Sequence, residues 1–451
     1  MNRAFLDYYK LPHDLVNFSL DGVLSKEPGF FRFGQEVLCY GRCSLSSFES
    51  ESGNGLQDTL DSVWSTGKQC YLPFDPTEVL DNLRFERYPP FLRKEERKRF
   101  VSDPRIRQIY YKVRPFLATW FRKYLQRIFL RDWQTLPFPQ WPLDTTVETI
   151  LERLMSQLLK TIGVKEIPFI WFWPYGFSSS AMVTHDVESA EGLGFCSKLM
   201  DIDDSYGIKS SFQIVPEGRY SASADFLNHL RERGFELNIH DLYHDGRLFD
   251  SRSTFNHRVK NLNQHAKRIN AIGFRSGAMY REVEWLSELD FSYDMSVPNV
   301  AHLDPQRGGC CTVTPYFAGR ILELPLTTTQ DYSLFSILND FSLDLWKKQI
   351  DLIRKKHGLI SILVHPDYLL EERRRRVYKS LLAHLSQLRS NRNIWVDLPA
   401  NINAWWRDRA QMELVQDGDV WRIEGPGSKR ACVAYAYLSG DQLDYHVVSP
   451  F

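Results

Sequence analysis

Carboxylates and histidines follow two apolar stretches that are typical of buried strands. Asp186 and Glu188 stand in Thr184-His-Asp-Val-Glu188, at the end of an apolar run. Side chains two residues apart on a strand share a face, so these carboxylates could converge on one site. His240 and His244 follow a later apolar run, and on a helical turn a spacing of four points both imidazoles the same way. Together they satisfy a two-histidine, one-carboxylate metal site and leave one carboxylate for acid–base chemistry.

Three further polar residues occur where other strands are expected to end. They are Arg275, Asp294 and His365. Taken singly, each has an ordinary structural interpretation: a surface ion pair for Arg275, a turn cap for Asp294 and a hydrogen-bonded strand-end imidazole for His365. Their joint occurrence with the carboxylates and the histidine pair favours a catalytic site.

The elements that must position these residues are alternating short strands and helices. From about residue 177, apolar strands are expected at 181–184, 211–215, 235–239, 291–295, 359–364 and 394–398, with helices at 254–272 and 342–357. Such alternation predicts a mainly parallel sheet, open or closed into a barrel. In both arrangements, functional sites lie at the carboxyl ends of the strands.

The rest of the chain has a different texture. Residues 1–92 are rich in Gly, Ser and Pro and predict an irregular, mixed region; residues 93–165 predict a basic helical region and a connector, with a helix at 147–162. We assign residues 166–408 to the strand–helix unit. Residues 409–451 alternate apolar and polar side chains between glycine-containing turns, which predicts a small antiparallel β domain.

A strongly basic stretch precedes the connector. Between Arg93 and Arg131 there are 13 Lys and Arg residues and three Asp and Glu residues, and the pattern at 114–131 predicts an amphipathic helix. An apolar face with cationic flanks is typical of helices that contact anionic membranes. The alternative is a helix packed on the main domain with a solvated basic face.

Composition excludes several classes of protein. The 451 residues carry 56 basic and 56 acidic side chains and are 43% hydrophobic, which predicts a soluble globular protein and no nucleic-acid partner. Seven cysteines without a Cys-x-x-Cys pair argue against a disulfide framework or a structural zinc site. The N-terminal residues lack the pattern of a secretory signal, so we expect a cytoplasmic protein, at most peripheral to the inner membrane face.

The ordered series of motifs resembles that of the polysaccharide deacetylases with a NodB homology domain, carbohydrate esterase family 4. The resemblance covers roughly residues 181–406, and five motifs occur in the family's order. It implies a deformed (β/α) barrel. It also implies hydrolysis of the N-acetyl group of an amino sugar, with one divalent metal, zinc.

The resemblance assigns a role to each motif residue. Asp186 matches the catalytic base, and Arg275 matches the arginine that orients it. His365 matches the catalytic histidine, and Asp294 matches the aspartate that orients that histidine. The metal ligands are matched by three residues: Glu188, His240 and His244.

Three positions depart from the usual family pattern. Val187 stands where the metal-binding aspartate is usual, and the carboxylate-x-carboxylate variant, which resembles peptidoglycan deacetylases, moves that ligand to Glu188. Asp241 stands where Ser or Thr is usual, and Gly277 replaces a proline.

The substrate suggested by the resemblance is an N-acetylated saccharide: a polysaccharide, a glycan precursor or a lipid-linked intermediate. Two alternatives stay open. The first, motivated by Val187, is a metal-independent amide or ureide hydrolase on the same fold. The second is a non-enzymatic glycan-binding or scaffold protein of a surface-polysaccharide pathway.

Overall fold

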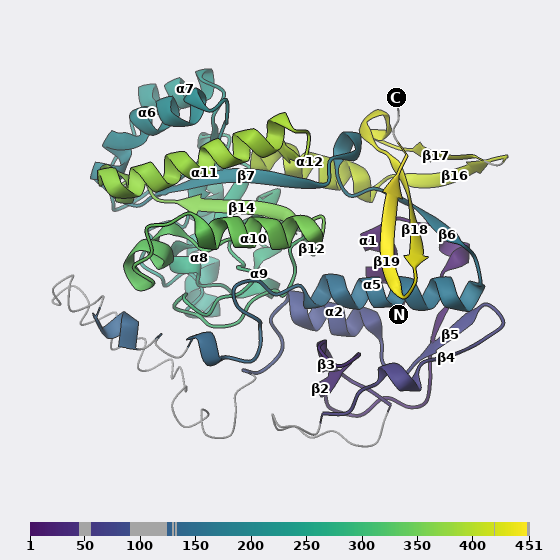
Figure 1. The fold of residues 1–451 in the computed structure, drawn as a ribbon. Helices are drawn as coiled ribbons and strands as arrows, with labels where there is room; N and C mark the ends of the chain where they lie inside the picture. Colours follow the sequence, from purple (N-terminus) through teal and green to yellow (C-terminus); the bar gives the residue numbers. More distant parts are fainter. Residues whose placement is uncertain (45–55, 91–123, 129, 131–132, 419, 449–451) are drawn as a thin grey trace.

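The chain forms an α/β unit that lies beside a mixed unit built from its N-terminal and C-terminal parts (Figure 1). The computed structural model describes residues 1–44, 56–90, 124–128, 130, 133–418 and 420–448. Most of the basic stretch at 93–131, including the larger part of the predicted helix 114–131, lies outside the described residues; residues 124–128 are helical. Within the described part of the chain, no helix is long and apolar enough to cross a membrane.

A curled, mainly parallel sheet is the centre of the α/β unit. Its spatial order is β12-β13-β11-β10-β9-β8-β7-β14, with β15 paired to the first half of β7 and only β12 antiparallel. The strands are β7 (Ser179–Val187), β8 (Ser211–Ile214), β9 (Glu236–His240), β10 (Gly273–Arg275), β11 (Tyr293–Asp294), β12 (Tyr316–Ala318), β13 (Ile321–Glu323), β14 (Leu359–Val364) and β15 (Ile394–Val396).

Helices cover the outer face of this sheet. They are α6 (Ala190–Ser205), α7 (Ala224–Glu232), α8 (Arg252–Arg268), α9 (Val283–Leu286), α10 (Asp344–Lys355) and α11 (Glu372–Ser390). The last helix, α12 (Pro399–Ala410), instead packs into the hydrophobic core of the neighbouring mixed unit. Helices α10 and α11 run along β14 and β7 (Figure 1). Every residue of β7 and β14 is buried, because helices and the barrel interior enclose both of their faces.

Threonine side chains close the sheet between β13 and β14. Beyond β13 the chain continues as Thr327 and Thr328, whose hydroxyls donate to the carbonyls of Leu359 and Ser361, each at 2.7 Å. The Ser361 amide donates back to the Thr327 hydroxyl at 2.9 Å. These side-chain bonds replace a regular strand ladder, so the expected (β/α) barrel is present in a deformed form.

The N-terminal and C-terminal parts share one hydrophobic core around α5 and β6. The N-terminal elements are α1 (Arg3–Tyr9), β1 (Phe18–Leu20), β2 (Gly29–Arg32), β3 (Leu38–Gly41), β4 (Trp64–Thr66), β5 (Gln69–Leu72), α2 (Pro76–Arg84), α5 (Thr146–Ile162) and β6 (Glu166–Ile170). The C-terminal strands are β16 (Glu413–Asp417), β17 (Val420–Glu424), β18 (Val433–Ser439) and β19 (Gln442–Val447).

The antiparallel C-terminal strands predicted from the sequence are confirmed, although they do not stand alone. β18 pairs with β19 on one side and with β6 on the other. Residues 166–170 therefore belong to the same small sheet as the C-terminal strands, whereas the sequence interpretation placed them in the strand–helix unit.

Candidate active site and metal centre

The predicted site residues gather at the carboxyl end of the curled sheet. Asp186 and Glu188 lie at the end of β7, and His240 ends β9. Arg275 ends β10, and His365 directly follows β14. Parallel pairing in the order β14-β7-β8-β9-β10 brings these strand ends to one edge, as expected for this class of sheet.

Three side chains form a group that could hold one metal ion. One ligand atom from each of Glu188, His240 and His244 lies within 4.8 Å of the others. Glu188 Oε1 is 2.8 Å from His244 Nε2 and 3.6 Å from His240 Nε2. Val187 between the two carboxylates is buried in the apolar cluster on the opposite face of β7, which follows from the alternation of side chains along a strand.

The donor set of this group fits a divalent ion such as zinc. Nε2 of His240 and Nε2 of His244 are buried, and among the described residues neither makes a hydrogen bond of acceptable geometry, although Glu188 Oε1 is close to both. Buried polar atoms are normally paired, so two orphaned imidazole nitrogens that face one carboxylate indicate a ligand. Two imidazoles and one carboxylate are a common ligand set for catalytic zinc.

Arg219 touches the outer side of His244. Its Nη2 donates to the His244 carbonyl at 2.7 Å and lies 3.0 Å from His244 Nδ1. A guanidinium only donates, so this contact favours the tautomer with the proton on Nε2. Metal binding at Nε2 requires the proton on Nδ1, so the exposed Arg219 side chain opposes metal binding unless it moves away.

The loop that carries the two histidines differs from the expected helical turn. β9 ends at His240, and residues 242–246 form bends rather than a helix. Asp241 and His244 adopt left-handed backbone conformations, with φ of 56° and 52°. These two reversals bring the imidazole rings to a centroid separation of 4.6 Å.

Gly277 is required by the close approach of this loop. A Cβ at position 277 would lie 2.6 Å from Asp241 Oδ2 and 3.2 Å from the Cα of His244. Asp241 is itself held by its amide, which donates to the Arg275 carbonyl at 2.9 Å. Positions 241 and 277 both depart from the usual family pattern, and the two departures are linked. The Asp241 side chain occupies space that a larger residue at position 277 would fill.

Asp186 is held as a buried carboxylate by Arg275. Arg275 Nη1 donates to Asp186 Oδ1 at 2.8 Å and to the Thr184 hydroxyl at 2.9 Å, and its Nε donates to the Met295 carbonyl at 2.9 Å. Burial by itself would raise the pKa of Asp186, but the charges of Arg275 and His240 outweigh it, and the pKa is lowered. Asp186 is thus held ionised, and its Oδ2 points toward the metal group, 3.6 Å from His240 Nε2.

His365 pairs with Asp331, and the expected pairing with Asp294 is wrong. His365 Nδ1 lies 2.6 Å from Asp331 Oδ1, and the His365 amide donates to Asp331 Oδ2 at 2.8 Å. Burial lowers the pKa of His365, but the Asp331 and Glu188 carboxylates outweigh it, and the pKa is raised well above its ordinary value. Nε2 of His365 is 3.4 Å from Glu188 Oε1, so the imidazole faces the metal group.

Asp294 instead belongs to a buried network below the site. Its carboxylate accepts from the amide and the hydroxyl of Ser296, at 2.9 and 2.7 Å. The Ser296 hydroxyl accepts from the Ser276 amide, next to Arg275. Glu323 hydrogen-bonds to Asp294, and burial and the Asp294 charge raise the pKa of Glu323 well above its ordinary value. Asp294 therefore supports the loop behind Arg275.

The sequence did not predict a role for Asp331, because the strand that precedes it, β13, gives a weak signal. β13 has only three residues, between Gly319 and Pro325, and Asp331 stands eight residues beyond its end. Asp294 follows a clearer apolar stretch at the distance that the motif order suggests. One sequence feature could have indicated this segment. Three consecutive threonines stand shortly before Asp331, and threonine hydroxyls can replace the backbone hydrogen bonds of a strand.

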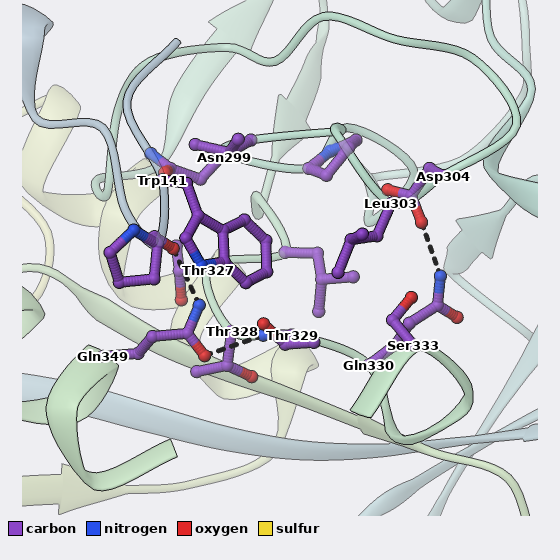
Figure 2. Close-up of a pocket in the computed structure, with 14 residues that line it drawn as sticks. Trp141, Asn299, Leu303, Asp304, Thr327, Thr328, Thr329, Gln330, Ser333 and Gln349 are labelled. Atoms are coloured by element: carbon purple, nitrogen blue, oxygen red, sulfur yellow. Dashed lines mark hydrogen bonds between the residues drawn. The ribbon is translucent and has the colours of Figure 1, made fainter. Parts of the chain in front are cut away.

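A narrow polar pocket fixes the segment that carries Asp331 (Figure 2). Gln349 accepts from the Thr329 amide at 3.0 Å and donates to the Pro142 carbonyl at 2.8 Å, and Gln330 donates to Asp304 at 2.6 Å. The pocket has about 20 Å³ of free volume, which is room for one water molecule. It stabilises the loop rather than receiving a sugar.

The fold and the site place the chain among α/β barrels with a carboxylate–histidine centre at the carboxyl ends of the strands. One similar solved structure is a putative polysaccharide deacetylase from Mycobacterium smegmatis, with 16% identity and a TM-score of 0.43 over 56% of this chain and 98% of that chain. Another is Puue allantoinase, with 11% identity and a TM-score of 0.40 over 52% of this chain and 92% of that chain.

A third similar structure is a putative polysaccharide deacetylase involved in O-antigen biosynthesis from Bordetella bronchiseptica. It has 16% identity and a TM-score of 0.31 over 51% of this chain and 84% of that chain. No family model matches the sequence, and no curated protein matches it either. We therefore base the proposed function on the geometry of the site.

Proposed function

We propose that this protein is a metal-dependent hydrolase that removes the N-acetyl group from an amino sugar of a polysaccharide, a glycan precursor or a lipid-linked intermediate. One observation carries the proposal. The group Glu188, His240 and His244 lies between a carboxylate held ionised, Asp186, and an imidazole held protonated, His365. An ionised base and a protonated acid on two sides of one metal group are what amide hydrolysis requires.

The chain's own residues supply both proton transfers. Asp186 takes the proton of the attacking water, and Arg275 keeps that carboxylate ionised and in position. His365 donates a proton to the leaving amine nitrogen as the C–N bond breaks, and Asp331 sets its orientation and charge. The products are acetate and a free amino sugar.

Glu188, His240 and His244 would hold the metal. A divalent ion supplies polarisation of the acyl carbonyl and a lower pKa for a bound water. His240 is oriented for this role, because its Nδ1 lies 3.2 Å from the Arg275 carbonyl and can donate to it, which leaves Nε2 free as a ligand.

A metal-independent amide or ureide hydrolase is a second candidate, favoured by Arg219. The contact of Arg219 with His244 Nδ1 places the imidazole proton on Nε2, 2.8 Å from Glu188. In that state His244 Nε2 can donate to Glu188 and cannot bind a metal. Turnover that is insensitive to a chelator would select this candidate.

Metal analysis and acetate release from N-acetylated chito-oligosaccharides test the first candidate. We expect one zinc per chain in the parent and its loss in His240→Ala. We expect Asp186→Asn to keep the metal and to lower kcat by a factor of about 10² to 10⁴, because only the base is removed.

His229→Ala is the matched control, since His229 is exposed on α7, away from the group. It should change neither metal content nor rate. Full metal content in His240→Ala would show that the ligand set is wrong, and retained turnover in Asp186→Asn would exclude Asp186 as the base.

A further inference from the structure

Helix α11 carries four consecutive arginines, residues 373–376, directly after its first residue, and only two of them form ion pairs within the described part of the chain. Arg374 forms an ion pair with Glu371 at 2.7 Å, and Arg375 forms one with Glu372. No ion pair joins Arg373 or Arg376 to any residue in the described part of the chain. Both are exposed, and they stand one turn apart on the same face of the helix.

These two arginines line an open pocket of about 300 Å³. The other lining residues are Phe341, Leu343, Val377 and Ser380. The Arg373 guanidinium lies 3.7 Å from the centroid of the Phe341 ring, which fixes its position on the pocket wall. The pocket thus combines two guanidinium groups, one hydroxyl and an apolar floor.

Ring contacts, bridged at one point by the Arg374 guanidinium, connect this pocket with the proposed catalytic histidine. The His365 ring is 5.1 Å from the Tyr368 ring, and Tyr368 stacks on Tyr332 at 5.8 Å. Arg374 lies over both Tyr368 and Phe335, at 5.6 and 5.8 Å. Phe335 in turn stacks on Phe341 at 5.5 Å. His365 directly follows β14, and Arg373 stands eight residues later at the start of α11, so the pocket lies near the carboxyl end of β14, where the site lies.

We propose that this pocket binds an anionic group, a phosphate or a carboxylate, carried by the saccharide substrate, so that the substrate class is an acidic saccharide. This inference rests on the proposed function, because it adds a subsite to the same reaction. Paired guanidinium groups match the oxygens of phosphate and carboxylate, and two neighbouring cations without a counterion are stabilised by an anion.

Binding of two oligosaccharides that differ in charge tests the subsite without needing turnover. We would titrate an Asp186→Asn background with a hyaluronan tetrasaccharide, which alternates N-acetylglucosamine and glucuronate, and with neutral chitotetraose. We expect the added double change Arg373→Gln and Arg376→Gln to weaken hyaluronan binding by about tenfold or more and to leave chitotetraose binding unchanged. Arg268→Gln, at an exposed position of α8, is the matched control for lost charge.

Competition by inorganic phosphate and by methyl glucuronide distinguishes a phosphate from a carboxylate as the preferred anion. Equal hyaluronan affinity in the parent background and in the double variant would overturn the subsite, as would an equal loss of affinity for both oligosaccharides. Failure of the proposed function appears separately, as absent acetate release from the parent protein while the charge-dependent binding persists.

Discussion

Asp331 Oδ1 lies 2.6 Å from Nδ1 of His365, and both side chains are buried at the end of β14. The same carboxylate also accepts from the His365 backbone amide through Oδ2. A buried carboxylate bonded twice to one histidine fixes both the ring orientation and the charge of that histidine. Asp331 is therefore a positioning residue for the proposed acid.

We expect Asp331→Asn to lower kcat for acetate release by a factor of about 10² or more, because the neutral asparagine side chain does not stabilise the positive charge of protonated His365. The pKa of His365 is raised in the parent, so rates that need protonated His365 fall only as the pH rises through that raised pKa. In Asp331→Asn the fall should move to lower pH. A pH profile of kcat measures the displacement.

Asp294→Asn is the comparison for that experiment, because Asp294 contacts Ser296 and not His365. We expect it to lower the free energy of unfolding by about 1–3 kcal/mol through lost buried hydrogen bonds. The high-pH limb of the kcat profile should stay where it is. If the high-pH limb moved as far in Asp294→Asn as in Asp331→Asn, Asp294 would contribute to the pKa of His365 as much as Asp331 does.

Gly277→Ala should disturb the histidine loop, because its Cβ would meet Asp241 Oδ2 at 2.6 Å. We expect a loss of about 1–3 kcal/mol in the free energy of unfolding and weaker metal binding, since the loop must shift. Gly194→Ala is the control, because a Cβ at this position of α6 meets nothing within 4 Å. It should raise the free energy of unfolding by about 0.5–1 kcal/mol. Denaturant unfolding and zinc titration measure both effects, and an unchanged Gly277→Ala protein would contradict the close packing.

Arg219→Met should strengthen zinc binding by about tenfold, because removing the guanidinium lets the His244 proton occupy Nδ1 and frees Nε2. Competition with a chelator of known affinity measures the change. Arg268→Met removes an equal charge elsewhere and should leave the affinity unchanged. Weaker zinc binding in Arg219→Met would mean that Arg219 supports the site instead of opposing it.

Asp304 gives the stability a pH dependence in the acidic range. Burial raises the pKa of Asp304 from 3.8 to about 6 in the folded protein. Between these values the folded state binds more protons than the unfolded state, so the free energy of unfolding falls as the pH rises through this window. We expect the contribution to be at most about 3 kcal/mol.

Asp304→Asn removes the titrating carboxyl and should flatten this part of the stability curve. Urea unfolding at several pH values between 4 and 6.5 gives the slopes of parent and variant. Identical slopes in the two proteins would place the pKa of Asp304 near its ordinary value in the folded state.

The strands that carry most of the site were predictable because they are buried on both faces. β14 begins and ends at the predicted residues 359 and 364, and the predicted helix at 147–162 matches α5 within one residue. Continuous apolar runs identify such strands without any tertiary information. The adjacent polar residues then predicted the gathering of Asp186, Glu188, His240, Arg275 and His365 at one edge of the sheet.

Short and irregular elements were not predictable in this way. β10 and β13 have three residues each, too few to show a period. The histidine loop follows no helical repeat, because its shape depends on left-handed conformations at Asp241 and His244 and on the space at Gly277.

The sequence by itself determined the fold class, the edge of the sheet that carries the site and the residue types that meet there. These follow from burial patterns and from the rule that parallel strands end together. Only the tertiary structure decided that Asp331 rather than Asp294 orients His365, and that Arg373 and Arg376 line an open pocket with Phe341 and Leu343. Each relationship joins segments that are distant in the sequence, Asp331 with His365 and Phe341 with Arg373, and local sequence patterns carry no information on how such segments pack.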